Sequence, residues 1–362
     1  VEQSRARHLH YALWVPDLLI KRADEGKHWS LFCPNEAPGL CNVWGEEFEK
    51  LYEKYESQGL ARKTIPASEL WVAIASAQFQ TGEPYILFKD ICNRFSNQQN
   101  LGTIKSSNLC TEIVEYTDEK EIAVCNLLSL CLPKFVKTGS NGKLEFDFIE
   151  FEKVAEFGNY TLNHIIDKTT YPLPQAKRSN LRNRPVGMGV QGQADLFLKL
   201  FVAWESAEAK ELNEKIYETL YYGGLKSSIE LAKIHGPYET YKESPYSKGL
   251  LHFDLMGLKP YGLWDWQNLR REGLQYGYYN SLVVALMPTA NSSKVGGNSD
   301  SFEPYQGYIT TQGTKCGTLL NVCDALIEKL IELGIWNTKI RDQILNSNGS
   351  IQNIKEIPTD VK

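Results

Sequence analysis

The sequence lacks several features that would identify common classes of protein. No apolar run approaches the ~20 residues that a membrane-spanning helix needs, and no signal peptide opens the sequence as given. Positive charge is not in excess, because 39 basic residues stand against 44 acidic ones, for a formal net charge of −5. Surfaces for nucleic acid or anionic membranes normally require such an excess. We therefore expect neither a membrane protein nor a direct nucleic-acid binder.

Cysteine is present, but without the spacing of disulfide or metal motifs. The chain has 8 cysteines, and no two of them form a CxxC pair. This pattern favours free thiols in a reducing compartment and predicts a cytoplasmic protein with no metal site. Cysteine is usually buried as a small hydrophobic residue, so simple packing is the first expectation for most of them. We apply it to Cys33, Cys41, Cys92, Cys131, Cys316 and Cys323.

Length and hydrophobic spacing predict a mixed α/β fold. The chain has 362 residues, 42% of them hydrophobic, which is enough for a large core and long for one ordinary domain. Helices are expected at residues 4–24, with Pro16 kinking or restarting the first, and at 43–57, 67–80, 146–167, 204–235 and 264–277. Strands are expected at 85–88, 186–190 and 282–286, and connections at 27–42, 93–100 and 180–184.

The stretch 107–131, SNLCTEIVEYTDEKEIAVCNLLSLC, carries the first candidate site. Two short apolar runs joined by a charged turn predict a β-hairpin. A period of two would place Asn108, Cys110 and Glu112 on one face, so that a thiol lies between an orienting amide and a general base. Cys125 lies on the return run, where the hairpin would bring it toward Cys110. Catalysis and simple packing both stay open on these residues alone.

The second candidate site follows the apolar run 282–286. Thr289, Ala290, Asn291 and Ser292 are small residues rich in hydroxyl and amide groups, placed where a short helix would begin. Backbone N–H groups at a helix N-terminus can bind an anion, but the same residues also suit an ordinary N-cap. Both interpretations remain open. The amides in residues 93–100 are similarly divided between nucleotide contact and loop capping, and capping is favoured.

A long segment resembles a known family. The run SNQQNLGTIKSSNLCTEIVEYTDEKEIAVCNLLSLCLP is similar to the active-site finger loop of the large, catalytic subunit of class I ribonucleotide reductase, closest to the eukaryotic and viral type. In order along the chain, WSLFCPNEAPGL, RPVGMGVQGQADLF, LWDWQNL, NSLVVALMPTANSSKVGGNSDSFEPY and NSNGSIQNIKEIPTDVK also resemble segments of that subunit. The resemblance covers nearly the whole chain.

The resemblance implies a fold and a mechanism. Residues 1–362 would form part, mainly the second half, of a ten-stranded α/β barrel with a central finger loop carrying Cys110. Cys110 would carry a transient thiyl radical that takes the 3′ hydrogen of a ribonucleoside diphosphate, with Glu112 as base and Asn108 bonded to the sugar. Cys125 would be one of two reducing thiols, and residues 289–292 would hold the diphosphate. The product would be a deoxyribonucleoside diphosphate for DNA replication.

The resemblance also implies partners rather than bound cofactors. A metal-containing small subunit would supply the radical, and thioredoxin or glutaredoxin would supply reducing equivalents. ATP and deoxynucleotide effectors would bind a region of the large subunit that lies outside this sequence. We therefore expect no cofactor held by this chain, and we expect it to need complementing large-subunit portions for turnover. Base preference, allosteric regulation and oligomeric state are left open.

Some positions depart from the family pattern. Asn291 stands where Ser or Thr is usual, Lys294 stands where Gln is usual, and residues 310–324 fit poorly. Two alternatives therefore accompany the main hypothesis. One is another thiyl-radical class of ribonucleotide reductase, which the eukaryote-like segments disfavour. The other is a reductase-derived interaction protein without catalysis, which the joint presence of Asn108, Cys110, Glu112 and Cys125 disfavours.

Overall fold

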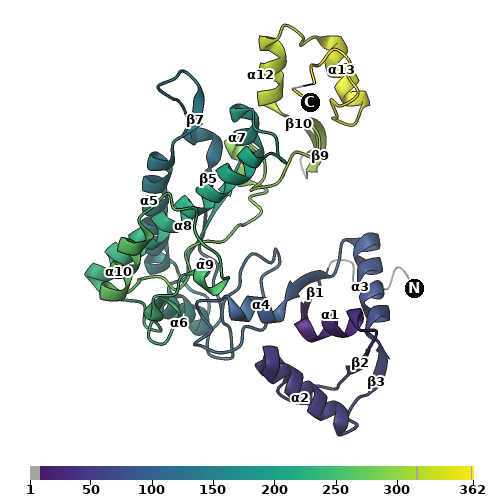
Figure 1. Cartoon of the computed structure of the whole chain (residues 1–362), viewed down its shortest axis with the longest axis vertical. Helices are drawn as coiled ribbons and strands as arrows, with labels where there is room; N and C mark the ends of the chain where they lie inside the picture. Colours follow the sequence, from purple (N-terminus) through teal and green to yellow (C-terminus); the bar gives the residue numbers. More distant parts are fainter. Residues whose placement is uncertain (1–8, 315–316, 360) are drawn as a thin grey trace. The chain divides into compact units, whose positions relative to one another are not determined.

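The computed structural model describes residues 9–314, 317–359 and 361–362, and they form two compact units (Figure 1). The first unit comprises Val1–Asn126, Asn159–Gly187 and Gly224–Ala285. The second comprises Leu127–Gly158, Met188–Gly223 and Leu286–Lys362. Each unit is built from three separate chain segments, so the long helices α5 (Phe148–Lys168) and α8 (Ala207–His235) contribute residues to both.

The first unit begins with alternating strands and helices. Its elements up to residue 94 are β1 (Ala12–Val15), α1 (Asp17–Asp24), β2 (His28–Leu31), a 3-10 turn (Leu40–Asn42), α2 (Gly45–Ser57), β3 (Lys63–Pro66), α3 (Ala67–Thr81), β4 (Tyr85–Phe88) and α4 (Lys89–Arg94). β1 pairs with β4 in parallel, and β2 pairs with β3 antiparallel. Their shared core contains Val15, Leu18, Leu19, Trp29, Phe48, Tyr52 and Ala67.

One buried carboxylate ties the starts of two helices together. Asp90 accepts the backbone N–H of Asp17 at 2.7 Å, in the first turn of α1, and that of Gly45 at 2.7 Å, in the first turn of α2. First-turn N–H groups have no partner inside their own helix and carry the positive end of the helix dipole. The single side chain therefore satisfies donors from two helices.

The expected first helix is only partly correct. Residues 12–15 form β1, and the helix begins at Asp17 after Pro16, whereas residues 4–8 of the predicted range lie outside the described residues. The residue before a proline is biased away from the helical region, so Pro16 separates a strand from a helix instead of kinking one helix. Residues 28–31, predicted as a turn-rich connection, likewise form β2.

The remainder of the first unit is mainly helical. It contains α6 (Pro174–Asn183), a 3-10 turn (Tyr246–Lys248), α9 (His252–Leu255) and α10 (Trp266–Tyr276). α6 corrects the predicted loop at 180–184, because Pro174 starts a helix that continues to Asn183. Residues 282–286 do not form the expected strand. An apolar run forms a strand only where another strand lies beside it with an unpaired edge. The apolar pattern of one segment does not show whether such a partner exists.

The second unit combines short strand pairs with helices. Its elements are β5 (Leu127–Cys131), a 3-10 turn (Leu132–Phe135), β6 (Val136–Thr138), β7 (Leu144–Phe146), β8 (Gly187–Gln191), α7 (Gln193–Leu200), α11 (Ser292–Gly296), β9 (Ile309–Thr314), β10 (Gly317–Val322), α12 (Asp324–Glu332) and α13 (Thr338–Asn346). β5 neighbours β8, and β6–β7 and β9–β10 are antiparallel pairs. Near the C-terminus, Ile309, Leu326, Leu330, Ile340, Ile344 and Ile351 are among the buried side chains of a second core.

The mixed helix and strand content confirms the predicted α/β class, but the strands do not close into a barrel. Within the described residues every sheet has two strands. The predicted hairpin at 107–131 is also wrong, because residues 107–126 contain no strand and only Leu127–Cys131 forms one, β5. Its backbone is held by turns and side chains instead, as described below.

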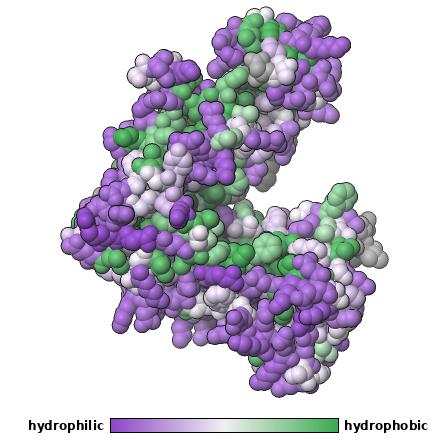
Figure 2. Space-filling model, viewed as in Figure 1, coloured by the Kyte–Doolittle hydropathy of each residue, from purple (hydrophilic) through white to green (hydrophobic). Residues whose placement is uncertain are grey.

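The surface mixes polar and apolar residues. Figure 2 shows mostly hydrophilic residues on the visible face, interrupted by hydrophobic patches. Large apolar side chains that reach solvent include Phe79 on α3, which is 95% exposed. In the part of the chain that the structure describes, no helix has the length and apolar character needed to cross a membrane.

Gly223 of α8 packs directly against α5 in the second unit. A Cβ built at Gly223 would lie 2.8 Å from the backbone oxygen of Glu152 and 2.9 Å from the Cβ of Ala155. Backbone atoms cannot rotate away as a long side chain can. The absence of a side chain at residue 223 therefore permits this helix packing.

Replacing Gly223 by alanine is expected to lower the free energy of unfolding by about 1–3 kcal/mol, because the added methyl group overpacks a helix contact. Chemical denaturation followed by circular dichroism measures this change. Lys210→Ala, at an exposed position of the same helix, is the control and should change stability by less than about 0.5 kcal/mol. Equal stability of Gly223→Ala and the parent chain would contradict the close packing.

Candidate active site

A turn, rather than a strand, organises the residues around Cys110. The backbone N–H of Thr111 donates to the carbonyl of Asn108 at 3.2 Å, and Thr111 has a φ of 68°. A left-handed conformation is uncommon for threonine and reverses the chain direction. The turn brings residue 112 back beside residue 108. The predicted grouping of Asn108, Cys110 and Glu112 therefore forms, but by a different geometry from the period-two pattern.

Asn108 is the centre of this turn. Its side-chain Nδ2 donates to Glu112 Oε2 at 2.7 Å, and its Oδ1 accepts the backbone N–H of Ile113 at 3.1 Å. Ser107 Oγ adds a bond to the carbonyl of Ile113 at 2.6 Å. Both ends of the amide are used, so the Glu112 carboxylate is held in one orientation next to the cysteine. This arrangement preorganises a potential base and orienter.

Cys110 is exposed at the tip of the turn. Desolvation raises the pKa of its thiol, and the negative charge of Glu112 raises it further. A carboxylate disfavours a neighbouring thiolate because like charges repel. At neutral pH, Cys110 is therefore a neutral S–H group that is accessible to a reactant.

Cys125 is also accessible to solvent, and the pKa of its thiol is strongly raised. Desolvation raises its pKa to about 11, with further contributions from Glu115, Glu112 and Cys110, in that order. The charges of Glu112 and Cys110 are therefore among those that act on the Cys125 thiol. The hairpin expected to bring Cys125 toward Cys110 does not form, and the association of the two cysteines stays a prediction.

Side chains from other segments of the first unit hold residues 107–126 in place. Gln98 Oε1 accepts the backbone N–H of Tyr116 at 2.7 Å. The buried carboxylate of Glu121 accepts from Asn183 Nδ2 at 2.9 Å and pairs with Arg182. Asn126 Nδ2 donates to Asn180 Oδ1 at 2.6 Å. These bonds replace the ladder that a strand would have supplied.

The predicted diphosphate residues lie in the second unit. Thr289 is buried with a φ of 49°, and its hydroxyl accepts the backbone N–H of Ser301 at 2.8 Å. Its carbonyl accepts from Ser293 N–H at 2.9 Å. Ala290, Asn291 and Ser292 are exposed at the start of α11. Thr289 therefore fixes the conformation of the loop from its buried side, and the next three residues are exposed to solvent.

Asn291 does not act as the side-chain N-cap that the alternative interpretation required. It occupies the N-cap position of α11 with a helical φ of −101° and ψ of −42°, and its side chain makes no capping hydrogen bond. Lys294, the second departure from the family pattern, forms an ion pair with Asp300 at 3.4 Å.

Comparisons with known proteins cover the whole chain. The family described as "Ribonucleotide reductase, barrel domain" matches residues 1–362. The chain belongs to this family. It is 50% identical to the ribonucleoside-diphosphate reductase large subunit of Plasmodium falciparum, covering 100% of this chain and 44% of that protein. It is 50% identical to the Arabidopsis thaliana large subunit, covering 100% and 46%.

A third relative, the large chain of Encephalitozoon cuniculi, is 49% identical over 100% of this chain and 46% of its own length. The chain thus spans somewhat less than half the length of the curated relatives that it matches. Membership of the ribonucleotide reductase barrel family confirms the resemblance seen in the sequence.

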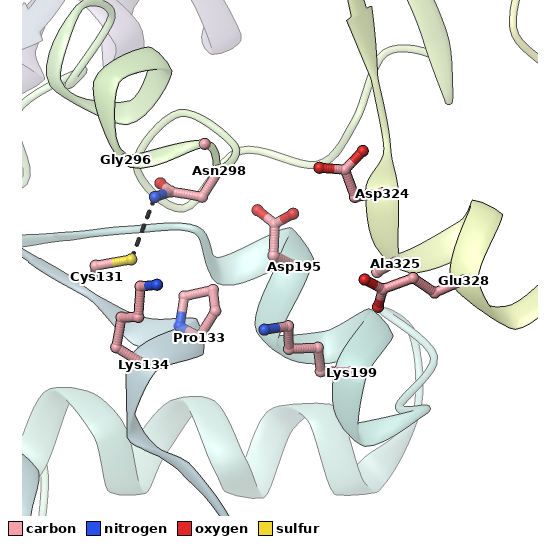
Figure 3. Close-up of a pocket in the computed structure, with 11 residues that line it drawn as sticks. Cys131, Pro133, Lys134, Asp195, Lys199, Gly296, Asn298, Asp324, Ala325 and Glu328 are labelled. Carbon is pink, nitrogen blue, oxygen red and sulfur yellow. Dashed lines mark hydrogen bonds between the residues drawn. The ribbon is translucent and has the colours of Figure 1, made fainter.

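A cavity of about 160 Å³ lies elsewhere in the second unit (Figure 3). It is lined by Cys131, Pro133, Lys134, Asp195, Lys199, Gly296, Gly297, Asn298, Asp324, Ala325 and Glu328. Asn298 Nδ2 donates to Cys131 Sγ at 3.2 Å, while Asp195 accepts from Ser299 N–H and Tyr305 O–H, both at 2.6 Å. The lining carries both charge signs and none of the predicted site residues.

The sequence also raised the question of what the amides of residues 93–100 contact. The amides of the 93–100 segment bond to protein groups: Asn97 Nδ2 to the carbonyl of Ser281 at 2.8 Å, and Asn100 Nδ2 to that of Thr240 at 2.9 Å. Both carbonyls are distant in the sequence, so these two bonds are tertiary contacts. Local capping is confirmed at Gln99, whose Nε2 donates to the carbonyls of Ser96 at 3.0 Å and Arg94 at 3.3 Å. In the described part of the chain, no cluster of three or more His, Cys, Asp or Glu side chains is arranged to hold a metal ion.

The prediction that the other cysteines are packed in the interior holds for some of them only. Cys323 is buried, and Cys33, Cys92 and Cys131 are half-buried. Cys41 is exposed, so the packing prediction is wrong for that residue, whose position in a 3-10 turn leaves its sulfur in solvent. Cys316 lies outside the described residues.

Sequence reasoning missed Glu115. This side chain is buried, and burial raises the pKa of its carboxyl to about 8. A glutamate within the apolar run IVEY was the available signal, because a charged residue type there is costly unless it is paired or neutral.

Glu112→Gln is expected to speed alkylation of Cys110 at pH 8 by about two- to fivefold, because removal of the carboxylate lowers the pKa of the thiol and raises the thiolate fraction. Glutamine keeps an acceptor for Asn108, so the turn should persist. Residue-resolved mass spectrometry after iodoacetamide treatment measures the rate.

Glu119→Gln is the matched control, since Glu119 is an exposed carboxylate of the same segment, and it should leave the Cys110 rate unchanged. An unchanged or slower rate in Glu112→Gln would show that Glu112 does not control the Cys110 thiol.

Proposed function

We propose that this chain is part of a ribonucleoside-diphosphate reductase large subunit and carries its radical cysteine. The observation that supports the proposal best is the turn that binds Asn108 to Glu112 around an accessible Cys110, in a chain that matches the family over residues 1–362. The relatives that share about half of its residues are named as large subunits of this reductase.

Each of the four residues has a defined role in the proposed reaction. An oxidised Cys110 sulfur takes the 3′ hydrogen atom of the ribose and returns a hydrogen atom at the end. Glu112 takes the proton of the 3′ hydroxyl, and Asn108 hydrogen-bonds the sugar. The 2′ hydroxyl leaves as water. Cys125 and a second thiol together give two electrons and two protons and become a disulfide.

The raised pKa values of both thiols suit this chemistry. A hydrogen-atom donor must keep its S–H bond, and burial together with the Glu112 charge keeps Cys110 protonated at neutral pH. Cys125, with a pKa of about 11, likewise remains a thiol until it is oxidised. Neither cysteine has the depressed pKa of a nucleophilic catalyst. The electrostatics therefore favour a radical and redox role over nucleophilic catalysis.

Residues 289–292 are proposed to bind the substrate diphosphate. Ala290, Asn291 and Ser292 are exposed, and Asn291 leaves the start of α11 without a side-chain cap. Uncapped backbone N–H groups and a serine hydroxyl are suitable donors for phosphate oxygens. The buried Thr289 fixes the backbone that presents them.

The wider proposal follows the family. The chain would provide part of the α/β barrel, with residues 107–126 as its finger loop, in a cytoplasmic enzyme. A metal-containing small subunit would generate the radical, and thioredoxin or glutaredoxin would reduce the Cys125 disulfide. Because the chain spans 44% of the P. falciparum relative, assays should include large-subunit segments that supply the remaining regions.

Cys110→Ser is expected to abolish reduction of radiolabelled CDP, since a serine oxygen cannot form a radical at the potential accessible to sulfur. The assay contains the chain, dithiothreitol, a radical-bearing small subunit and the complementing large-subunit segments. Cys41→Ser, at another exposed cysteine, should retain full activity. Full activity of Cys110→Ser would disprove the radical role, and no activity of the parent assembly would oppose the proposed function.

Ala290→Asp is expected to raise the KM for CDP at least about tenfold with a smaller effect on kcat, because a carboxylate placed there repels the diphosphate. Val295→Asp introduces the same charge at a residue of α11 that is 92% exposed and should raise KM much less. Steady-state kinetics in the same assembly measure both. Equal effects of the two variants would contradict a diphosphate site at residues 289–292.

A further inference from the structure

Asn126 directly follows Cys125, and the proposed mechanism gives it no task. Cys125 is exposed, whereas only 6% of Asn126 is exposed. The Asn126 amide donates from Nδ2 to Asn180 Oδ1 at 2.6 Å and to the carbonyl of Pro185 at 2.8 Å, and its Oδ1 accepts from Asn180 Nδ2 at 3.2 Å. Its backbone carbonyl accepts the N–H of Gly187 at 2.8 Å. The two amides therefore bind each other reciprocally, next to the candidate redox cysteine.

The partner amide belongs to helix α6 and is itself fixed. Asn180 is fully buried. Besides Asn126, its Nδ2 donates to the hydroxyl of Tyr171 at 2.6 Å, and that hydroxyl donates to the carbonyl of Ile166 at 2.7 Å. A helix is a more rigid support than an irregular segment, and a buried amide with satisfied donors and acceptor is held in one orientation. Asn180 therefore offers Asn126 a fixed partner.

The run that carries Cys125 is attached to α6 at both of its ends. At one end, the backbone N–H of Ile122 donates to the carbonyl of Gln175, in the first turn of α6, at 3.3 Å. At the other end stands the pair formed by Asn126 and Asn180. Cys125 lies between these two attachments, so they limit how far its sulfur can move.

The function proposed for Cys125 depends on the position of its sulfur. A disulfide forms only when the two cysteines approach within a narrow range, with Cα atoms about 4.4–6.8 Å apart. Residues 107–126 contain no strand, so no ladder sets the position of Cys125. Hydrogen bonds from its neighbour to a rigid helix supply the restraint that a ladder would otherwise give.

We propose that Asn180 is a positioning residue for Cys125, and that it acts through its reciprocal amide pair with Asn126. The pair fixes the chain directly after the cysteine, while the thiol itself stays accessible to a reactant. The buried amides therefore restrict the position of Cys125 without covering it. The consequence for turnover rests on the proposed function, whereas the restraint on Cys125 does not.

Alkylation of Cys125 tests the proposal without any turnover. Asn180→Ala removes the pair and leaves every residue near Cys125 in the sequence unchanged. Parent chain and variant are treated with iodoacetamide at pH 9, and each cysteine is followed by mass spectrometry. Desolvation is the largest cause that raises the pKa of the Cys125 thiol. Its alkylation is expected to rise at least about threefold in the variant, because a released run hydrates the sulfur and increases the thiolate fraction.

Cys110 in the same sample is the internal control, because the turn around it is held by bonds among Asn108, Glu112 and Ile113. Its alkylation rate should change much less than that of Cys125. An unchanged Cys125 rate would overturn the proposal. An equal increase at both cysteines would also overturn it, since that result would indicate general loosening of the segment.

Tyr171→Phe is the matched control variant. It removes the hydroxyl that Asn180 bonds on its other side, but it leaves the pair with Asn126 intact. The ratio of Cys125 to Cys110 alkylation should therefore stay close to that of the parent chain. A rise as large as that in Asn180→Ala would overturn the proposal, because loss of any hydrogen bond near α6 would then have the same effect.

Asn180→Asp is the conservative variant. It keeps an acceptor for Asn126 Nδ2 but loses the donor to Asn126 Oδ1, so its Cys125 to Cys110 ratio should fall between those of Tyr171→Phe and Asn180→Ala. If the alanine variant does not fold, the aspartate variant decides the question. A ratio equal to that of Tyr171→Phe would then overturn the proposal.

Kinetics in the complemented assembly test the consequence for turnover. For CDP, kcat is expected to fall at least about threefold in Asn180→Ala while KM changes less than about twofold, because the predicted diphosphate residues are untouched. A raised KM with unchanged kcat would overturn the role of Asn180 in positioning the reducing thiol. An inactive parent assembly would oppose the proposed function, and the alkylation ratios would still decide whether Asn180 restrains Cys125.

Discussion

The irregular segment 107–126 must satisfy its backbone and buried polar groups without a sheet, and the rest of the candidate site depends on how it does so. Amide and carboxylate side chains accept the backbone N–H groups: Asn108 accepts from Ile113, Gln98 from Tyr116, and Asp118 from Glu121. A strand ladder would have made these bonds among backbone atoms alone. Because side chains make them, the segment can keep a sharp turn at Cys110 and still hold its neighbours in fixed positions.

The same side chains set the chemistry of the thiols. Glu112 accepts a hydrogen bond from Asn108, and its charge adds to the effect of desolvation in raising the pKa of Cys110. At Cys125, desolvation raises the pKa most, and the charge of Glu115 comes next. Glu112 therefore has a structural and an electrostatic role at once. The result is two accessible but protonated cysteines, which suit transfer of hydrogen atoms and reducing equivalents better than attack by a thiolate.

Local patterns were sufficient for much of the secondary structure. The helices predicted at 43–57, 67–80 and 204–235 are present as α2, α3 and α8, with boundaries that shift by a few residues. Their apolar spacing and terminal signals act within the helix itself. The run 282–286 and the predicted hairpin failed because a strand requires a partner, and partners come from distant parts of the chain. β1, for example, pairs with β4 about 70 residues later.

The sequence alone determined the family, the residue types at the site and their order, because NLCTE and MPTAN are contiguous motifs whose chemistry can be read directly. It also brought Asn108 and Glu112 together, since a turn of five residues is local. Only the tertiary structure decided that Glu115 is buried and that Gln98, Asn180 and Asn183 hold the segment. Burial and long-range hydrogen bonds depend on which distant residues become neighbours, and no periodicity within a single segment contains that information.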